Sequence, residues 1–544
     1  MSNAVAEGGP AGPGSQERGE AQEQGMVGAD SLIRSLLASG VNTCFANPGT
    51  SEIHLVAAID QLSGMRPVLC LFEGVATGAA DGYARMAGRP AATLLHLGPG
   101  LANGLANLHD ARRALSPIVN IVGDHAQSHR QFDAPLTSDI EGFARPVSTF
   151  VRTVRDVGEA GRDAAQAVAA ARSAPGVATL IVPADISWSR GGTVSSLIQP
   201  VPPGQVATAR VTAAADALRS ARRPAILMSG RVLRQAPLEL AGRVAAATGA
   251  RLYCDFFAPR IERGAGLVPV RRLAYFGERV IEELTGTDVL ILIETEPPVA
   301  FFGYPNSPSE LTPPGTRVLQ LARRSEDGPS ALAALADIVG TNGEMPRQVL
   351  AQPDLPEGPL TPSSAAAVIA ALLPENAIVV DESCTSGMAV QPLCQAAAPH
   401  DWLAHTGGAL GLGLPLSAGA AVACPGRKIL CLLGDGSAMY TLQALWTLAR
   451  ENLDVIAIVF ANRAYAIINY ELQRLGVSAG AAALSMIDLT RPQLRFVDLA
   501  RGMGVESSRV ETAGSFASEL RSALGTRGPR LIELALVGPG SVRA

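Results

Sequence analysis

Short apolar segments alternate with amphipathic segments along most of the chain, and this alternation predicts its secondary structure. In the first third, apolar runs predict strands over 43–46, 67–72, 91–96 and 117–122. A polar or glycine-rich turn and then a segment with helical periodicity follow each run, which is typical of parallel sheets covered by helices on both faces. Ahead of the first strand, Asp30 is expected to cap a helix that runs through Leu37 and ends at Gly40.

Two stretches rich in proline and glycine, 190–208 and 352–362, interrupt this pattern and are typical of linkers. Further strands are expected over 225–228, 251–254, 289–293, 317–321, 377–380, 429–433, 455–460 and 530–533. The chain is therefore predicted to be an α/β protein of three doubly wound parallel-sheet domains, over 27–190, 208–350 and 361–540. Residues 1–26, which are polar and lack an apolar segment, are expected to form a disordered leader.

Composition narrows the class of protein. Hydrophobic residues make up 47% and charged residues 17%, with a formal net charge of -5 and no basic patch, which argues against nucleic-acid and membrane-surface partners. No apolar run is long enough to span a bilayer. The seven cysteines form no C-x-x-C pair, which argues against a disulfide framework or a zinc site and favours a cytoplasmic location.

The segment that points most directly to chemistry is ILCLLGDGSAMYTLQALWTLARENLDVIAIVFANRAY, residues 429–465. Asp435 follows one predicted strand and Asn462 follows the next, so both lie at the same edge of a parallel sheet. A carboxylate and an amide oxygen are ligands that suit Mg2+, and the backbone carbonyl of Ala464 is the expected third ligand.

The same turn is suited to a phosphate. Gly434 and Gly436 allow the backbone to approach a ligand closely, and the N–H groups of Ser437 and Ala438 open a helix whose dipole favours an anion. A bare G-D-G is compatible with an ordinary glycine-rich turn. The strand, helix, strand and asparagine turn that follow it favour a site for a cation and a phosphate.

GDGSAMY followed by ANRAY resembles the signature of the thiamine-diphosphate-dependent superfamily that includes acetolactate synthase, benzoylformate decarboxylase and pyruvate decarboxylase. The family segment ends in a double asparagine; here the first of the pair is Ala461 and the metal-binding second is Asn462. The resemblance, which is strongest to the acetolactate synthase large-subunit-like group, implies thiamine diphosphate and Mg2+ as cofactors and Tyr465 as a cofactor contact. It also implies a pyrimidine-binding, a central and a diphosphate-binding domain, and leaves FAD in the central domain open.

The N-terminal domain carries the family's partner motifs. The segment LFEGVATGAADGYAR, residues 71–85, matches the family over its length and implies that Glu73 is the catalytic carboxylate that hydrogen-bonds N1′ of the aminopyrimidine. A lone glutamate there would otherwise be an acid at the start of a helix. FANPGTSE and LHLGPGLAN also resemble family turns, in which Thr50 matches a substrate-side serine and His96 matches a histidine that moves protons.

Two motifs in the C-terminal domain extend the resemblance. TGGALGLGLP, residues 406–415, resembles the pyrimidine-binding stretch, where Leu410 would hold the cofactor in its bent form and the Gly408 carbonyl would accept from the 4′-amino group. DESCTSG, residues 381–387, resembles a turn that contacts the diphosphate, with Cys384 and Thr385 nearest. Each glycine turn alone is compatible with ordinary loop geometry.

The resemblance implies decarboxylation of a 2-oxo acid and transfer of the acyl-anion equivalent to a second carbonyl, in a homodimer or homotetramer whose active sites lie between subunits. A simple decarboxylase of the benzoylformate decarboxylase type, a nicotinamide or flavin oxidoreductase, and a catalytically degenerate cofactor-fold binding protein remain alternatives. No G-x-G-x-x-G with a following acid supports the oxidoreductase, because Gly98-x-Gly100 is followed by Asn103.

Overall fold

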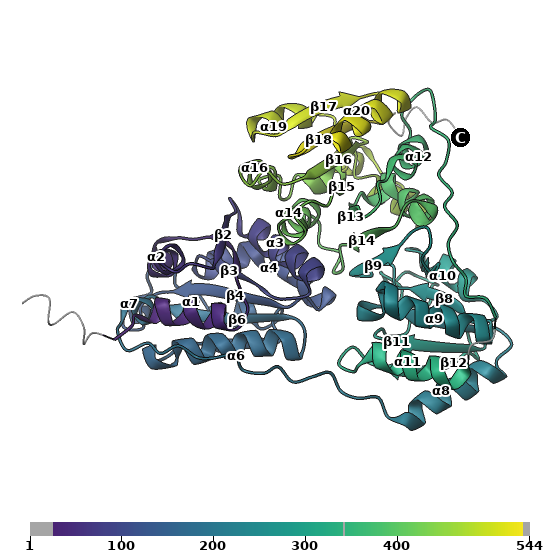
Figure 1. The fold of residues 1–544 in the computed structure, drawn as a ribbon. Helices are drawn as coiled ribbons and strands as arrows, with labels where there is room; N and C mark the ends of the chain where they lie inside the picture. The colour runs from purple at the N-terminus through teal and green to yellow at the C-terminus, as the bar shows by residue number, and fades with distance from the viewer. Residues whose placement is uncertain (1–24, 341–342, 537–544) are drawn as a thin grey trace, which may run out of the picture.

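The computed structural model describes residues 25–340 and 343–536, and within these the chain forms three sheets of six, five and seven strands, each flanked by helices (Figure 1). The α/β class predicted from the sequence is confirmed. All but the last two residues of the expected leader lie outside the described residues.

The N-terminal sheet has the strand order β2-β1-β3-β4-β6-β5 and is parallel throughout. Its strands are β1 (Thr43–Asn47), β2 (Arg66–Leu69), β3 (Ala91–Leu95), β4 (Ile118–Asp124), β5 (Phe150–Thr153) and β6 (Val177–Pro183). One face packs on α1 (Gly28–Ala38), α2 (Ile53–Gln61) and α6 (Ala160–Ser173), and the other on α3 (Glu73–Ala87) and α4 (Leu97–Ala114). The short helices α5 (Ile140–Ala144) and α7 (Ala184–Trp188) complete the domain.

The expected cap of the first helix is wrong. The helix begins at Gly28 with Val27 as its N-cap, so Asp30 lies in the first helical turn. Val27 pairs with Arg190 in an isolated bridge, and the helix begins three residues earlier than it would with Asp30 as its N-cap. Gly40, with a φ of 83°, follows the helix end, as expected.

The central sheet has the order β10-β8-β7-β11-β12. Its strands are β7 (Pro224–Met228), β8 (Arg251–Cys254), β10 (Arg271–Arg272), β11 (Val289–Ile293) and β12 (Arg317–Ala322), and its helices are α8 (Thr208–Ser220), α9 (Gln235–Thr248), α10 (Gly277–Leu284) and α11 (Gly328–Val339).

The C-terminal sheet has the order β17-β18-β16-β15-β13-β14-β9. Its strands are β13 (Ile378–Glu382), β14 (His400–Ala404), β15 (Ile429–Gly434), β16 (Val455–Ala461), β17 (Glu506–Val510), β18 (Arg530–Ala535) and the antiparallel edge strand β9 (Arg260–Arg263). Its helices are α12 (Pro362–Leu372), α13 (Val390–Leu393), α14 (Gly413–Ala423), α15 (Asp435–Ala438), α16 (Ala444–Arg450), α17 (Ala466–Arg474), α18 (Ala481–Ser485), α19 (Phe496–Gly502) and α20 (Ala513–Gly525).

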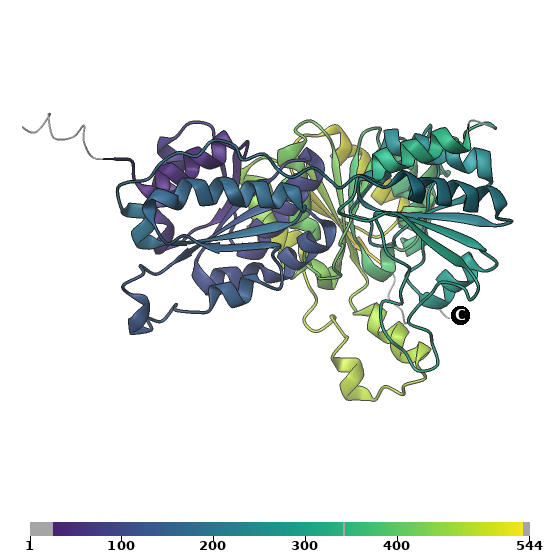
Figure 2. The same ribbon diagram turned by 90° about the horizontal axis from the view of Figure 1, so that it is seen from below.

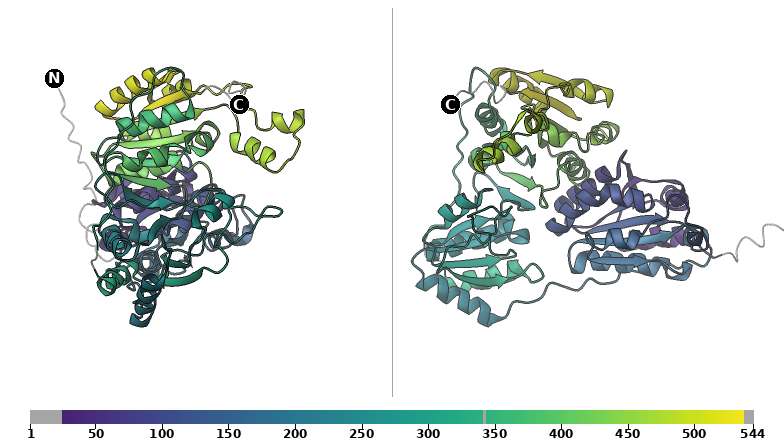
Figure 3. Two further views of the ribbon diagram at one scale, coloured as in Figure 1. Left: turned by 90° about the vertical axis from the view of Figure 1, so that its right-hand side faces the viewer. Right: turned by 180° about the vertical axis from the view of Figure 1, so that it is seen from behind.

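We propose domain limits of 27–190, 208–350 and 361–540, because in the described residues the intervening stretches contain no helix or regular strand. The first of them runs as a long open trace between α7 and α8, visible from the front and from behind (Figures 1 and 3). None of the helices in the described residues has the length and apolarity needed to cross a bilayer.

The N-terminal and C-terminal domains meet where α3 crosses α14, and small residues allow the two helices to approach closely. A Cβ on Gly419 would overlap the carbonyl oxygen of Ala79, and one on Gly82 would overlap that of Leu416. The cores of the two domains are continuous across this contact. The crossing therefore fixes the start of α3, at Glu73, relative to the loop that precedes α14.

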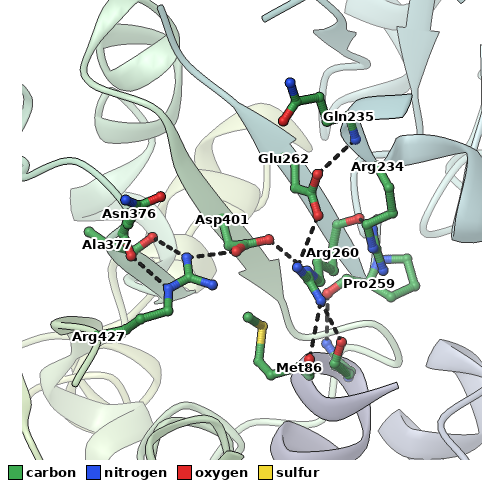
Figure 4. Close-up of polar contacts among 11 residues, drawn as sticks. Met86, Arg234, Gln235, Pro259, Arg260, Glu262, Asn376, Ala377, Asp401 and Arg427 are labelled. Atoms are coloured by element: carbon green, nitrogen blue, oxygen red, sulfur yellow. Dashed lines mark hydrogen bonds and ion pairs between the residues drawn. The ribbon is translucent and has the colours of Figure 1, made fainter. Parts of the chain in front are cut away.

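A polar junction joins all three domains around β9 (Figure 4). Arg260 on β9 donates from Nε to Asp401 on β14 at 2.6 Å, and from Nη1 to the carbonyl of Arg85 at the end of α3 at 3.1 Å. Arg427 donates to the other oxygen of Asp401 at 2.7 Å. By contrast, the segment that holds α17 and α18 projects away from the three sheets (Figure 2).

Candidate active site

Three turns converge where the adjacent strands β13, β15 and β16 end. They are residues 383–387, residues 434–438 and residues 462–465. Asn462 donates from Nδ2 to Ser386 Oγ at 2.8 Å, which joins the first turn to the third. Ser437 Oγ donates to the carbonyl of Glu382 at 3.3 Å, which joins the second turn to the end of β13. The edge that the sequence identified is thus one connected surface.

Asp435 lies at the start of α15 and reaches the asparagine turn. Its Oδ2 accepts from the Arg463 N–H at 2.5 Å and its Oδ1 from the Gly436 N–H at 2.9 Å. Asn462 Oδ1 accepts from the Ala464 N–H at 2.9 Å. Burial raises the pKa of Asp435, against the lowering effect of the backbone donors.

The donor set at this turn fits Mg2+. A carboxylate has about four lone-pair positions, so two remain on Asp435 after the two backbone bonds. Asn462 adds an amide oxygen and Ala464 a main-chain carbonyl, and oxygen ligands of this kind, few in number and completed by diphosphate and water, are what Mg2+ takes in proteins. A buried carboxylate whose pKa is raised by desolvation also gains most from a cation beside it.

Space for a diphosphate is kept by glycines and by the turn 383–387. A Cβ on Gly436 would overlap the ring of Tyr465, and one on Gly434 would lie 3.7 Å from Cβ of Cys384. Cys384 has a φ of 51°, the left-handed region, and begins a 3-10 turn with Thr385. Ser437 and Ala438 are buried in the first turn of α15, beside Gly434.

Two buried carboxyl groups anchor the loop expected to hold the pyrimidine, by accepting hydrogen bonds from its backbone N–H groups. Glu382, at the end of β13, accepts from the N–H groups of Gly411 (2.6 Å), Leu412 (3.1 Å) and Gly413 (2.9 Å). Asp110, on α4, accepts from the N–H of Gly407. Burial raises the pKa of Glu382 to about 8 and that of Asp110 to about 7.

Between these two anchors the backbone turns at Gly408, which has a φ of 75°. A Cβ there would lie 2.9 Å from Cζ of Phe301, a residue of the central domain, so Phe301 packs directly on Gly408. Leu410 is half-buried in the same loop. Loop 406–413 is therefore held by contacts from all three domains.

Glu73 is the first residue of α3 and is buried, with 6% of its surface exposed. Its Oε2 accepts from Asn103 Nδ2 on α4 at 3.0 Å. A Cβ on Gly100 would lie 3.1 Å from Glu73 Oε1, so glycine at this position leaves the second carboxylate oxygen accessible. No hydrogen bond in the described part of the chain links this carboxylate to the C-terminal domain.

His96 is the N-cap residue of α4 and pairs with a carboxylate that the sequence analysis did not identify. Its Nδ1 lies 2.8 Å from Oε2 of Glu52, which is fully buried, and the same oxygen accepts from the Gly49 N–H at 2.8 Å. Oε1 of Glu52 is buried without a hydrogen-bond partner among the described residues. Thr50 begins the turn that ends at Glu52 and is exposed.

The structure thus brings the predicted residues into groups, with the metal and diphosphate residues at one sheet edge, and Thr50 and His96 together beside Glu52. It adds three acids that sequence reasoning missed, Glu52, Asp110 and Glu382. Two of the three had a signal. Glu52 ends the quoted FANPGTSE motif, and Glu382 is an acid at the end of an apolar strand in DESCTSG.

Comparisons with known proteins agree with this geometry. Residues 26–144 match the model described as the thiamine pyrophosphate enzyme N-terminal TPP binding domain, and residues 382–534 match the C-terminal TPP binding domain. A Mycobacterium tuberculosis protein that carries the provisional name acetolactate synthase large subunit IlvX is 51% identical over 94% of this chain and 99% of its own length. Benzoylformate decarboxylase of Pseudomonas aeruginosa is 28% identical over 91% of this chain and 96% of its own length.

Solved structures agree on the fold. The thiamine diphosphate-dependent 4-hydroxybenzoylformate decarboxylase of Rhodococcus jostii RHA1 superposes with a TM-score of 0.83 at 24% identity, covering 95% of this chain and 100% of that one. The two matched domains contain the turns at Asp435 and Glu73, and the M. tuberculosis relative spans nearly the whole chain. The chain therefore belongs to the thiamine pyrophosphate enzyme family.

Proposed function

We propose that this chain is a thiamine diphosphate- and Mg2+-dependent enzyme that decarboxylates a 2-oxo acid and transfers the acyl-anion equivalent to a second carbonyl compound. The observation that carries the proposal is the meeting of Asp435 with the Asn462 turn at one sheet edge, beside the glycines that a diphosphate requires. The 51% identity to a protein named as an acetolactate synthase large subunit supports the transfer step.

Each group of residues has a part in this proposal. Asp435, Asn462 and the Ala464 carbonyl would hold Mg2+, and the N–H groups of Ser437 and Ala438 would receive the diphosphate. When bound, thiamine diphosphate supplies an electron sink next to the substrate carbonyl.

Glu73 would hold a proton at the pyrimidine N1′. Asn103 donates to one of its oxygens, which fixes the carboxylate and leaves the other oxygen for the ring nitrogen. Burial strengthens a hydrogen bond at this position, because water does not compete for it.

Glu52 orients His96 for proton transfer to or from the substrate. With Nδ1 held by the carboxylate, Nε2 is the nitrogen left to face a ligand, and a carboxylate partner stabilises the imidazolium that forms when His96 takes a proton. Thr50, exposed in the same turn, would contact the substrate.

A simple decarboxylase is the second candidate, and the Glu52–His96 pair favours it. A histidine that delivers a proton to the acyl-anion equivalent gives an aldehyde, whereas an acceptor carbonyl gives an acyloin or a 2-hydroxy-2-oxoalkyl acid. A panel of 2-oxo acids assayed with thiamine diphosphate and Mg2+, for CO2 and for products, separates the two. Aldehyde as the sole product at every acceptor concentration would refute the carboligase.

Cofactor binding separates both enzymes from a degenerate binding protein. We expect thiamine diphosphate with Mg2+ to bind and raise the unfolding temperature, and Asp435→Ala to abolish that rise. A protein that binds neither would contradict the enzymatic proposal.

We further propose a homodimer or homotetramer in which Glu73 serves the site formed by Asp435 of another subunit. Mixing the inactive variants Glu73→Ala and Asp435→Ala by co-expression tests this. If the two residues come from different chains, half of the sites in each mixed dimer are intact, so total activity recovers to about a quarter of the wild-type value in a random assortment. If both residues serve one site within a chain, every site carries a lesion and no activity returns.

A further inference from the structure

The central domain has a cavity at the edge where doubly wound sheets bind dinucleotides. In such sheets the phosphates lie outside the carboxyl ends of the strands, against the N–H groups that open the following turns and helices. Here that edge lines a cavity of about 660 Å³, bounded also by the end of α4 and by loop 406–413. Its volume lies in the range of small-molecule and cofactor sites.

Glu294 lies at this edge in an unusual backbone conformation. It follows β11 directly and has a φ of 55°, the left-handed region that favours glycine over a residue with a side chain. Its side chain is buried, with 3% of the residue exposed. A strained, buried acid at this position requires compensating contacts.

The compensation comes from the turn after β7, on one side of β11. Glu294 Oε2 accepts from the backbone N–H of Arg231 at 2.6 Å, and Oε1 pairs with the Arg231 guanidinium at 2.6 Å. A Cβ on Gly230, in the same turn, would overlap Oε2. The carboxylate therefore lies against the glycine turn in which a phosphate would bind.

The start of α11, which follows β12 on the other side of β11, makes the second contact. A Cβ on Gly328, the first residue of α11, would lie 2.7 Å from Glu294 Oε1, so the carboxylate packs against the start of this helix, whose Gly328 N–H donates to the carbonyl of Glu326 at 3.0 Å. One carboxylate thus takes the donors of a glycine turn and also lies against a helix N-terminus.

We propose that Glu294 is an internal anion that fills the phosphate position of the central domain and closes it to the diphosphate of a dinucleotide such as FAD. A second carboxylate opposes an incoming anion: the half-buried Asp255, directly after β8, accepts from Thr295 Oγ1 with both oxygens, at 2.8 and 2.9 Å. Arg113 and Arg324 line the same cavity, and their positive charges attract the Asp255 carboxylate. The residues at this edge do not fit a flavin, and this inference does not depend on the reaction proposed above.

Ligand binding to the full-length protein, saturated with thiamine diphosphate and Mg2+, tests the proposal. The probes are FAD and ADP, followed by isothermal titration calorimetry and by the quenching of flavin fluorescence. We expect no binding of either by the wild-type protein at about 100 µM, a concentration that would saturate a site with a Kd of about 1 µM. Glu294→Gly, which relieves the backbone strain and frees the N–H group and the guanidinium of Arg231, should bind ADP at least about tenfold more tightly.

Matched variants exclude general effects on the cavity. Glu296→Gln removes an exposed carboxylate from the same cavity and should leave binding unchanged. Glu294→Gln keeps the shape of the side chain without its charge and should show part of the gain in affinity for ADP. It replaces the glycine variant in the test if that variant does not fold. Wild-type protein that binds FAD stoichiometrically overturns the proposal, and so do folded Glu294 variants that bind ADP no better than the wild type.

Discussion

Removing the Glu382 side chain tests whether a buried carboxyl group holds the loop that we propose to bind the pyrimidine. Glu382→Ala leaves the N–H groups of Gly411, Leu412 and Gly413 without their acceptor in a site where Glu382 is 1% exposed. An unsatisfied buried donor costs about 1–3 kcal/mol, so three cost about 3–9 kcal/mol. We expect a loss near the lower end, because the volume of the deleted carboxyl group can admit water.

Glu382→Gln should lose less. The amide oxygen can replace Oε1, which accepts from Gly411 and Leu412, whereas the new NH2 group faces the N–H of Gly413. One unmade bond corresponds to about 1–3 kcal/mol, so with an alanine loss near about 3 kcal/mol the alanine variant should be less stable than the glutamine variant by up to about 2 kcal/mol.

Urea denaturation in a Trp188→Phe background measures these losses, because the remaining tryptophans, Trp402 and Trp446, both lie in the C-terminal domain. Glu375→Ala, an exposed glutamate of the same domain, is the control and should change stability by less than about 0.5 kcal/mol. Both Glu382 variants should also weaken thiamine diphosphate binding, with alanine the weaker. If Glu382→Ala were as stable as the control and bound the cofactor normally, the loop would not depend on this carboxylate.

The remaining predictions concern the proton-transfer pair, the pH dependence of stability and the helix crossing. Glu52→Gln should lower kcat by about 10–100-fold with little change in KM, because His96 keeps its place but loses the charge that stabilises its imidazolium; an unchanged kcat in a CO2-release assay would exclude the pair. Folding raises the pKa of Glu382 from 4.5 to about 8, so the folded state holds a proton that the unfolded chain releases. The unfolding temperature should therefore fall between pH 5 and 8, and fall less in Glu382→Gln; equal slopes in the two proteins would disprove the assignment. Gly419→Val places a side chain in the backbone of α3 and should cost about 3 kcal/mol or more, whereas Gly514→Ala, in α20 where a Cβ meets nothing within 4 Å, should not lower the unfolding temperature in the same thermal scan.

The sequence predicted most of what depends on local pattern. Buried strands such as β15 and β16 are continuous apolar runs, and the turns that follow them carry Asp435 and Asn462 to one edge by the handedness of a single strand–helix–strand unit. Strands with polar or mixed residues, such as β5 (FVRT) and β14 (HDWLA), were not predicted from the sequence. Their burial depends on neighbours far along the chain.

The parts of the site that the sequence did not reveal are pairings across long stretches of chain. Glu52 and His96 are 44 residues apart, and Glu382 is 29–31 residues from the three N–H groups that it accepts from. The local periodicity of the sequence does not indicate which loop will pack over a given carboxylate. Glu294 is harder still to predict, since its role depends on a backbone angle that places an acid where glycine is favoured.

The strand β9 has a consequence for how this protein can be divided. It lies near the middle of the chain, within the central segment, yet it forms the outermost member of the C-terminal sheet by antiparallel pairing with β14. A fragment that begins after the second linker would expose the hydrogen-bonding groups of β14 to solvent and to other molecules, which is a route to aggregation. Recombinant dissection or domain exchange in this chain should therefore transfer residues 260–263 together with the C-terminal segment.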